Sequence, residues 1–154
     1  MAFIQDRSCG CRHNNQYQPS KPAKIFLECG FDPQDAIFEI DDGRVEDGQK
    51  FVLDRVLIDT TQLCRPQIKF EFSSLVVFEA EDEEGTEHEV EVNLLFKLEK
   101  VCNGVVECVR SWDYLKEFDI ENDIDELEVE ISEPFTVTFC DKVCPGCCEY
   151  RMVV

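Results

Sequence analysis

The chain has 154 residues, of which 34 are acidic and 15 are Lys or Arg, so its formal net charge is −19; it also contains 10 cysteines. This charge argues against nucleic acid as a partner, because phosphate binding needs clustered Lys and Arg, and it disfavours anionic membranes. A chain of this length with 12 Phe is most simply one domain whose core forms without disulfides, so the cysteines need another explanation.

Residues 1–23 predict an extended N-terminal connector arm. They are rich in Asn, Gln, Ser, Pro and Arg, show no apolar periodicity, and contain Cys9 and Cys11. The first seven residues lack the basic start and apolar run of a secretory signal, and no apolar run in the chain could span a bilayer. We therefore expect cytoplasmic synthesis without a signal peptide, with stable disulfides forming only after release into an oxidising environment.

Residues 24–154 predict one β-domain, because short apolar segments are broken by Gly, Asp and Pro. Sustained alternation of apolar and polar residues predicts long, half-buried antiparallel strands at residues 68–78, 90–98 and 127–139. Shorter strands are expected at residues 25–29, 36–40, 51–58, 105–112 and 148–154, and acidic loops at residues 81–85 and 119–125. About eight strands and no amphipathic helix predict an all-β fold, a jelly-roll type β-sandwich, with an ordinary Greek-key sandwich as the alternative.

The densest cysteine cluster runs from Cys140 to Cys148. Within it, Cys144-Pro-Gly-Cys147 has the spacing of a zinc knuckle, but a structural zinc site needs a second matching pair, and the other close pairs lack that spacing. A thioredoxin-like redox role needs a helix N-terminus that the sequence does not predict. We expect no metal and no cofactor, and keep a cysteine-rich metal-binding module as an alternative.

The pleat of a strand predicts which cysteines face solvent. Cys147 and Cys148 are neighbours at a strand start, so they point to opposite faces, and Cys147 is expected to point outward. Cys140 continues the outward-facing positions Thr136 and Thr138 of the strand predicted at residues 127–139, so it is also expected to face solvent. Cys29 lies on the apolar face of the first predicted strand, where a buried thiol and a linking role both stay open.

No catalytic constellation is visible. His13 and His88 are too isolated for a His-based site, and there is no Ser-His-Asp arrangement, nucleophile elbow or Gly-rich phosphate loop. The acidic stretch at residues 123–126 lacks the ligand spacing and Gly of an EF-hand. We expect a protein that is not an enzyme.

Two kinds of segment carry a family resemblance. The more specific is the C-terminal block from Phe139-Cys140 through Cys144-Pro-Gly-Cys-Cys-Glu-Tyr150. The others are Leu27-Glu28-Cys29-Gly30, Val56-Leu57-Ile58-Asp59-Thr60-Thr61, Pro66 with Ile68-Lys69-Phe70, Phe72-Ser73-Ser74, and Leu95-Phe96 with Val101-Cys102. Over residues 24–154 the chain resembles a family of small cysteine-rich proteins of unknown function from spore-forming anaerobic bacteria. That family implies no activity.

The plan of a cysteine-bearing arm ahead of a β-sandwich is also similar to that of endospore appendage subunits. That resemblance implies that the arm of one subunit forms disulfides with strand cysteines of subunits further along a fibre, and that neighbouring sheets augment one another edge to edge. Cys9 and Cys11 match the arm, and their implied partners are Cys29 and either Cys147 or Cys148. The surplus of cysteines and the strong acidity depart from that family, so the pairing and the helical symmetry stay open.

These features together predict a structural subunit whose partner is itself, in a disulfide-cross-linked filament at the spore or cell surface. A connector of about 20 residues can reach on the order of 60 to 70 Å, which is enough to cross a neighbouring domain. The candidates for intermolecular disulfides are Cys9, Cys11, Cys29, Cys147 and Cys148. The other possible disulfide residues are Cys64, Cys102, Cys108, Cys140 and Cys144. The alternative is a spore-coat or exosporium layer protein that is cross-linked without ordered fibres.

Overall fold

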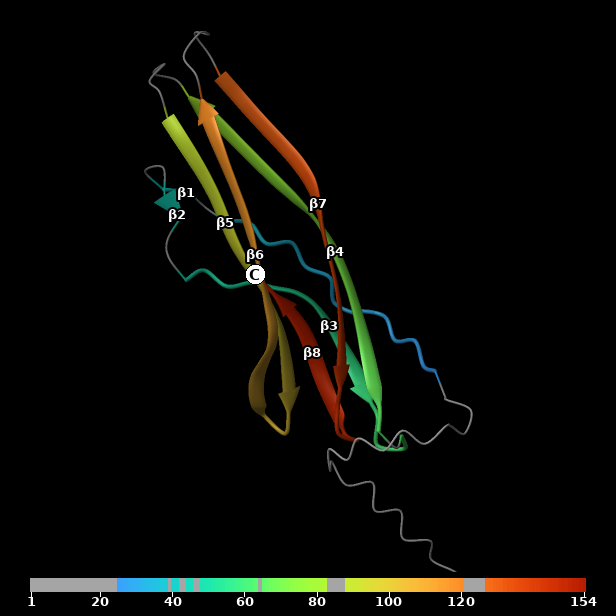
Figure 1. Ribbon diagram of the computed structural model, residues 1–154. Helices are drawn as coiled ribbons and strands as arrows, with labels where there is room; N and C mark the ends of the chain where they lie inside the picture. Colours follow the sequence, from blue (N-terminus) through green and yellow to red (C-terminus); the bar gives the residue numbers. More distant parts are fainter. Residues whose placement is uncertain are drawn as a thin grey trace, which may run out of the picture.

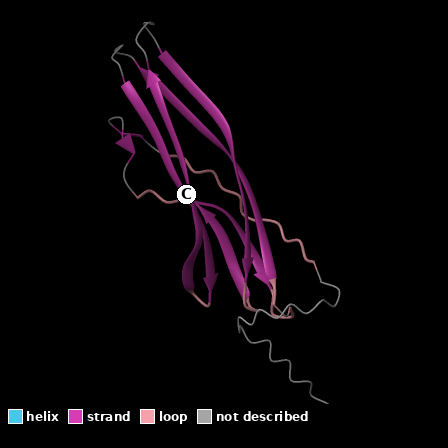
Figure 2. Cartoon of the chain, viewed as in Figure 1, coloured by secondary structure: helices cyan, strands magenta, loops and turns pink. Residues whose placement is uncertain are grey.

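The structure is a computed structural model that describes residues 25–154 apart from residues 39, 42–43, 46–47, 64, 83–87 and 121–126. Every regular element in these residues is a β-strand, so the predicted all-β class is confirmed (Figure 1; Figure 2). The strands are β1 (Ile40–Asp41), β2 (Arg44–Val45), β3 (Val52–Asp59), β4 (Gln67–Asp82), β5 (His88–Cys102), β6 (Val105–Ile120), β7 (Leu127–Lys142) and β8 (Cys147–Val153). The predicted arm at residues 1–23 lies outside the described residues.

Six long strands form the two antiparallel sheets of a sandwich. One sheet has the order β3-β8-β5-β6, and the other consists of β4 and β7. The pairing is nested, with β5 on β6, β4 on β7 and β3 on β8, which is the pattern of an antiparallel ribbon rolled up as in a jelly roll. The prediction of eight sandwich strands is wrong in number, since β1 and β2 form a separate ladder of two residues each.

Residues 25–38 run beside β3 without forming a strand (Figure 1). The strands predicted at residues 25–29 and 36–40 are therefore wrong, except that Ile40 belongs to β1. Two backbone hydrogen bonds tie the segment to β3, from Phe31 N to Arg55 O at 3.0 Å and from Gln34 N to Leu53 O at 2.7 Å. Between them Pro33 has no amide hydrogen to donate, which interrupts a regular ladder.

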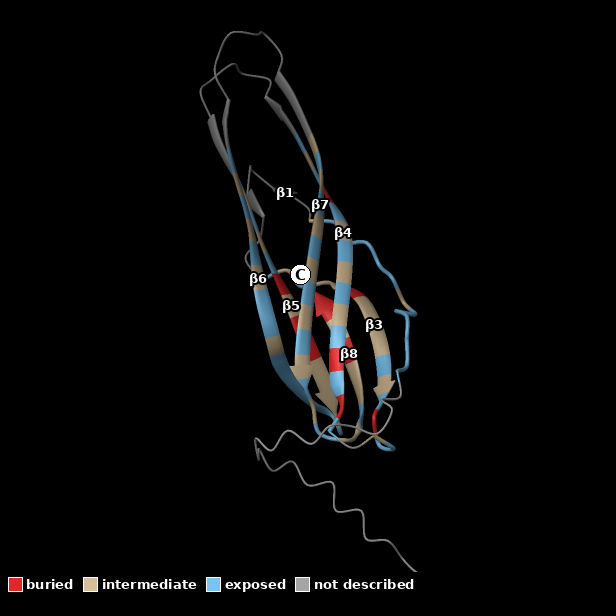
Figure 3. Cartoon of the chain, turned by 45° about the vertical axis from the view of Figure 1, so that its right-hand side comes forward, coloured by how far each residue is buried: buried red, intermediate tan, exposed pale blue. Residues whose placement is uncertain are grey.

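The core lies between the two sheets, and the predicted alternation places it there (Figure 3). Its buried members are Leu53, Ile68, Val76, Phe96, Leu98, Tyr150 and Met152. Aromatic rings join the sheets: Phe96 stacks on Phe135 with ring centroids 3.9 Å apart, and Phe70 packs on Tyr150 at 4.7 Å. Burial raises the pKa of Tyr150 to about 12, so this phenol stays neutral over the physiological range.

Glu99 departs from the alternation. It follows the inward-facing Leu98 and would point to solvent if the alternation continued, yet its side chain is only 8% exposed. The carboxylate lies 2.7 Å from Lys50 Nζ and 2.8 Å from Arg151 Nε. Burial raises the pKa of Glu99, but the two cationic partners together outweigh that effect and hold the pKa below its ordinary value. Paired cations therefore explain why a carboxylate is tolerated at this buried position.

Acidic residues are concentrated in two stretches of the sequence. Eight of the 34 acidic residues lie in residues 79–91 and nine in residues 117–133, and neither stretch contains Lys or Arg. These stretches span the connections from β4 to β5 and from β6 to β7, and the adjoining strand ends lie at one end of the molecule (Figure 1). We call this the acidic end. The β5–β6 turn and the β7–β8 loop lie at the opposite end.

Candidate functional site: the cysteine-rich end

Six of the described cysteines lie at the end of the sandwich opposite the acidic end, and one of them, Cys144, lies in the β7–β8 loop. Cys102 is the last residue of β5 and Cys108 lies near the start of β6. Cys140 lies near the end of β7, and Cys147 and Cys148 begin β8. Because neighbouring strands are antiparallel, these starts and ends meet at one place. We call this region the cysteine-rich end.

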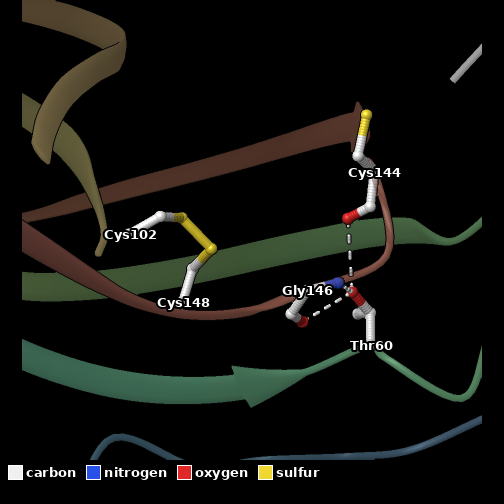
Figure 4. Close-up of a disulfide and its surroundings, with 5 residues drawn as sticks. All are labelled: Thr60, Cys102, Cys144, Gly146 and Cys148. Atoms are coloured by element: carbon white, nitrogen blue, oxygen red, sulfur yellow. Dashed lines mark hydrogen bonds between the residues drawn. A yellow bond between two sulfur atoms is a disulfide. The ribbon is translucent and has the colours of Figure 1, made fainter.

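Cys102 and Cys148 form a disulfide within the chain (Figure 4). It joins β5 to β8 across a Cα–Cα distance of 4.7 Å, one step beyond the paired residues Val101 and Glu149. The sequence alone left open whether Cys147 or Cys148 is the linking residue of β8. In the structure Cys148 is disulfide-bonded to Cys102, whereas Cys147 is an exposed free thiol.

Thr60 fastens the loop that carries Cys144 to the end of β3 (Figure 4). Thr60 is 5% exposed, its N donates to Gly146 O at 2.7 Å, and its Oγ1 accepts from Gly146 N at 3.0 Å. The hydroxyl also lies 2.9 Å from Gly146 O and 3.4 Å from Cys144 O, the two acceptors that its single hydrogen can reach. Cys144 itself is disulfide-bonded. The loop that leads into Cys147 is therefore held by hydrogen bonds to a buried residue rather than left to move freely.

Four cysteines of the described chain are free and exposed, and they are Cys29, Cys108, Cys140 and Cys147. The outward positions expected for Cys140 and Cys147 are confirmed. At Cys29, where a buried and a linking thiol were both open, the side chain is exposed because the segment that carries it does not enter the sheet. Cys9, Cys11 and Cys64 lie outside the described residues.

The exposed thiols of β7 and β8 have different charged neighbours. Cys140 lies opposite Lys69 of β4, and Cys147 lies opposite Asp59 of β3. Lys69 is ion-paired with Glu71. The hydrogen bond to Glu71 is the main cause that raises the pKa of Lys69, and the neighbouring Cys140 adds the smallest contribution. The exposed thiol of Cys140 therefore lies across the strand pair from a cation, and that of Cys147 from a carboxylate.

An accessible thiol can attack a disulfide of another chain by thiol–disulfide exchange. It can also pair with a thiol of another chain when an oxidant such as dioxygen takes up the two electrons and two protons that are released. Across the described part of the chain, no group of three or more His, Cys, Asp and Glu side chains is arranged to hold a metal ion. Nor do these residues include a helix that is long and apolar enough to cross a membrane. The roles of Thr60 and Glu99 were missed from the sequence, where each is one polar residue in a strand-like stretch and carries no local signal.

Comparison with known protein families identifies a match. The model of a family described as a domain of unknown function, DUF4489, matches residues 23–154. A search of curated proteins finds no match, and a search of solved structures finds none either. The match agrees with the predicted resemblance to a family of unknown function. The resemblances to spore-former proteins and to appendage subunits stay predictions.

Proposed function

The chain belongs to the DUF4489 family, and we propose that it is a structural subunit that assembles with copies of itself into a disulfide-cross-linked filament. The filament lies outside the cell, at a spore or cell surface, and the N-terminal arm staples each subunit to its neighbours. The observation that carries the proposal is the set of four exposed free thiols on a domain whose core and internal Cys102–Cys148 bridge do not use them.

The arrangement of charge supports assembly through the cysteine-rich end. Half of the carboxylates of the chain belong to residues 79–91 and 117–133, the two stretches that adjoin the strand ends of the acidic end, so two copies are expected to repel each other there. Residues 1–23 contain one Asp and three Lys or Arg, so the arm is basic while the body is acidic. Electrostatic attraction therefore draws the arm of one copy toward the body of another before any covalent bond forms.

Cys9 and Cys11 supply the arm thiols, and the exposed thiols of Cys29 and Cys147 are their proposed partners on the domain. Dioxygen of the oxidising surroundings takes up the two electrons and two protons released for each disulfide. Cys148 is set aside because it is already bonded to Cys102. Once interchain disulfides have formed, dissociation requires bond breakage instead of a shift in a binding equilibrium. A filament built this way resists heat, denaturant and protease.

The test is denaturing gel electrophoresis of the purified, air-exposed protein with and without reductant, together with negative-stain microscopy. We expect a ladder that collapses to a band of 17.8 kDa on reduction, and fibres in the micrographs. The double variant Cys9→Ser, Cys11→Ser should lose the ladder. The control variant Cys108→Ser removes an exposed thiol that the proposal does not use, and it should keep the ladder.

A single monomer band in the absence of reductant would contradict the proposal. So would a ladder of unchanged intensity in the arm double variant. Cross-linked material without fibres would instead favour the alternative of an amorphous spore-coat or exosporium layer.

A further inference from the structure

The residues just after the arm form an exposed apolar segment, Ile25–Cys29, which we call the donor segment. Ile25, Phe26 and Leu27 are 90%, 63% and 88% exposed. Within the described chain, the backbone bonds that tie residues 25–38 to β3 begin only at Phe31. Water contact with three large apolar side chains in a row is costly, so this segment gains free energy from any partner that covers it.

A groove that could accept such an apolar segment runs along the free edge of β4. The edge strand β4 is paired with β7 on one side only, so its other side offers unpaired backbone groups. Two adjacent hollows of about 250 and 270 Å³ follow this edge from Glu71 to Val77. Their far wall is formed by residues 33–38 and by β3.

The groove has an apolar floor and mouth. Leu53, Val76 and Phe96 line the larger hollow and belong to the buried core, so the hollow reaches the interior between the sheets. Leu75 and Val77 line the same hollow and are exposed at its rim. An unpaired strand edge above an apolar floor is the arrangement that accepts an added strand in β-augmentation.

The donor segment of the same copy cannot fill this groove. Pro33 and Gln34 line the smaller hollow, and the chain runs antiparallel to β3 from there back through Phe31. The donor segment continues along β3 beyond Phe31 and so leads away from the larger hollow. Residues 33–38, which connect it to the rest of the domain, already line the groove. The occupant must therefore come from another copy.

Charge and length select the donor segment over the other exposed strands. The groove carries the carboxylates of Asp35, Asp54 and Glu71, so a strand from the acidic end would be repelled. The donor segment has a single carboxylate, Glu28, and the two lysines of residues 21–24 precede it. Five extended residues span about 17 Å, which fits within the seven residues of β4 that border the groove.

We propose that the donor segment of one copy adds as a β-strand to the free edge of β4 in a second copy, with Ile25 and Leu27 facing the apolar floor. The contact is non-covalent and positions Cys29 beside the neighbouring subunit before disulfides form. This inference rests on the proposed function, since it gives the filament its first contact.

The experiment uses the full chain with Cys9→Ser and Cys11→Ser and with its internal disulfides intact, so that stapling by the arm plays no part. The probe is a fluorescent peptide of residues 22–30 with Cys29→Ser, whose binding is followed by anisotropy. We expect saturable binding, and at least tenfold weaker binding of the peptide that also carries Ile25→Asp and Leu27→Asp, because two buried apolar contacts are lost. A Glu28→Gln peptide is the matched control and should bind at least as well as the parent.

Amide hydrogen exchange then locates the site. With the peptide at about 100 times its dissociation constant, alternate amides between Glu71 and Val77 should exchange up to roughly a hundredfold more slowly. Absence of binding, equal binding of the Asp-substituted peptide, or protection along β6 or β7 instead of β4 would each overturn the proposal. If the peptide binds but the native chain shows no disulfide ladder, strand addition is retained and the stapling function is rejected. If the native chain shows the ladder but the peptide does not bind, strand addition alone is rejected.

Discussion

The carboxylate of Asp54 occupies the space that a side chain at Gly30 would need. The same Asp54 Oδ1 accepts hydrogen bonds from Asp32 N at 3.2 Å and from Arg55 N at 2.7 Å. Gly30 therefore permits a close approach that holds the segment after the arm against β3. The fixed segment in turn forms one wall of the groove beside β4.

Gly30→Ala should loosen this segment, because its new Cβ overlaps with the Asp54 carboxylate. We expect faster amide exchange at Phe31 and Gln34, whose amides bind β3 carbonyls. Gly146→Ala is the control, since the nearest atom to a Cβ there is Cys144 O at 3.9 Å. Adding Asp54→Ala to Gly30→Ala removes the overlap, although it also removes the two hydrogen bonds. Unchanged exchange in the single variant would mean that the segment is held in some other way.

Thr60→Val should destabilise the domain by about 1–3 kcal/mol, because it leaves the Gly146 amide without its hydroxyl acceptor at a buried site. The free energy of unfolding in urea, measured without reductant, is the readout. Thr138→Val makes the same chemical change at an exposed position on β7 and should shift stability by less than about 0.5 kcal/mol. Equal effects of the two substitutions would show that the loop does not depend on Thr60.

Replacing Cys102 and Cys148 together by Ser should cost about 2–4 kcal/mol of stability. The bridge closes a loop with a sequence separation of 46, and the loss of that constraint lowers the free energy of the unfolded chain. Cys147→Ser, at the neighbouring position, removes an exposed thiol and should leave the stability of the monomer unchanged. Urea unfolding of both variants at one protein concentration checks this. A double variant as stable as the parent would contradict a stabilising role of the bridge.

Glu99→Gln should reduce stability in a pH-dependent way. Burial raises the pKa of Glu99, yet Lys50 and Arg151 outweigh it, so the folded-state pKa lies below the ordinary value of 4.5. A lowered pKa means that the ionised group stabilises the fold above about pH 4.5 and that this contribution is lost as the pH falls through the folded-state pKa. At pH 7 the variant should be less stable by about 1–3 kcal/mol.

The difference in unfolding free energy between the parent and Glu99→Gln should therefore shrink as the pH falls below 4.5. Glu117→Gln is the control, because that side chain is exposed on β6, and it should show no comparable trend. A difference that stays constant down to pH 3 would rule out the ionised pair as its cause.

The sequence by itself determined the fold class and most of the long strands. Residues 68–78, 90–98 and 127–139 alternate in polarity and lie within β4, β5 and β7, because alternation is a local property that assigns each side chain to one face of a sheet. The same rule placed Cys140 and Cys147 on the outside. It failed at residues 25–29, which have the composition of a strand but whose neighbours Gly30 and Pro33 lie where a regular ladder on β3 is interrupted.

Only the tertiary structure decided which residues meet across the chain. Three contacts join residues that are 46 or more positions apart. They are the Cys102–Cys148 bridge, the hydrogen bonds between Thr60 and Gly146, and the ion pairs of Glu99 with Lys50 and Arg151. Local pattern carries no information on such contacts, because they depend on which strands become neighbours when the nested ribbon folds. The thiols left free at the surface follow from that pairing, and they could not be separated from the bonded ones by spacing alone.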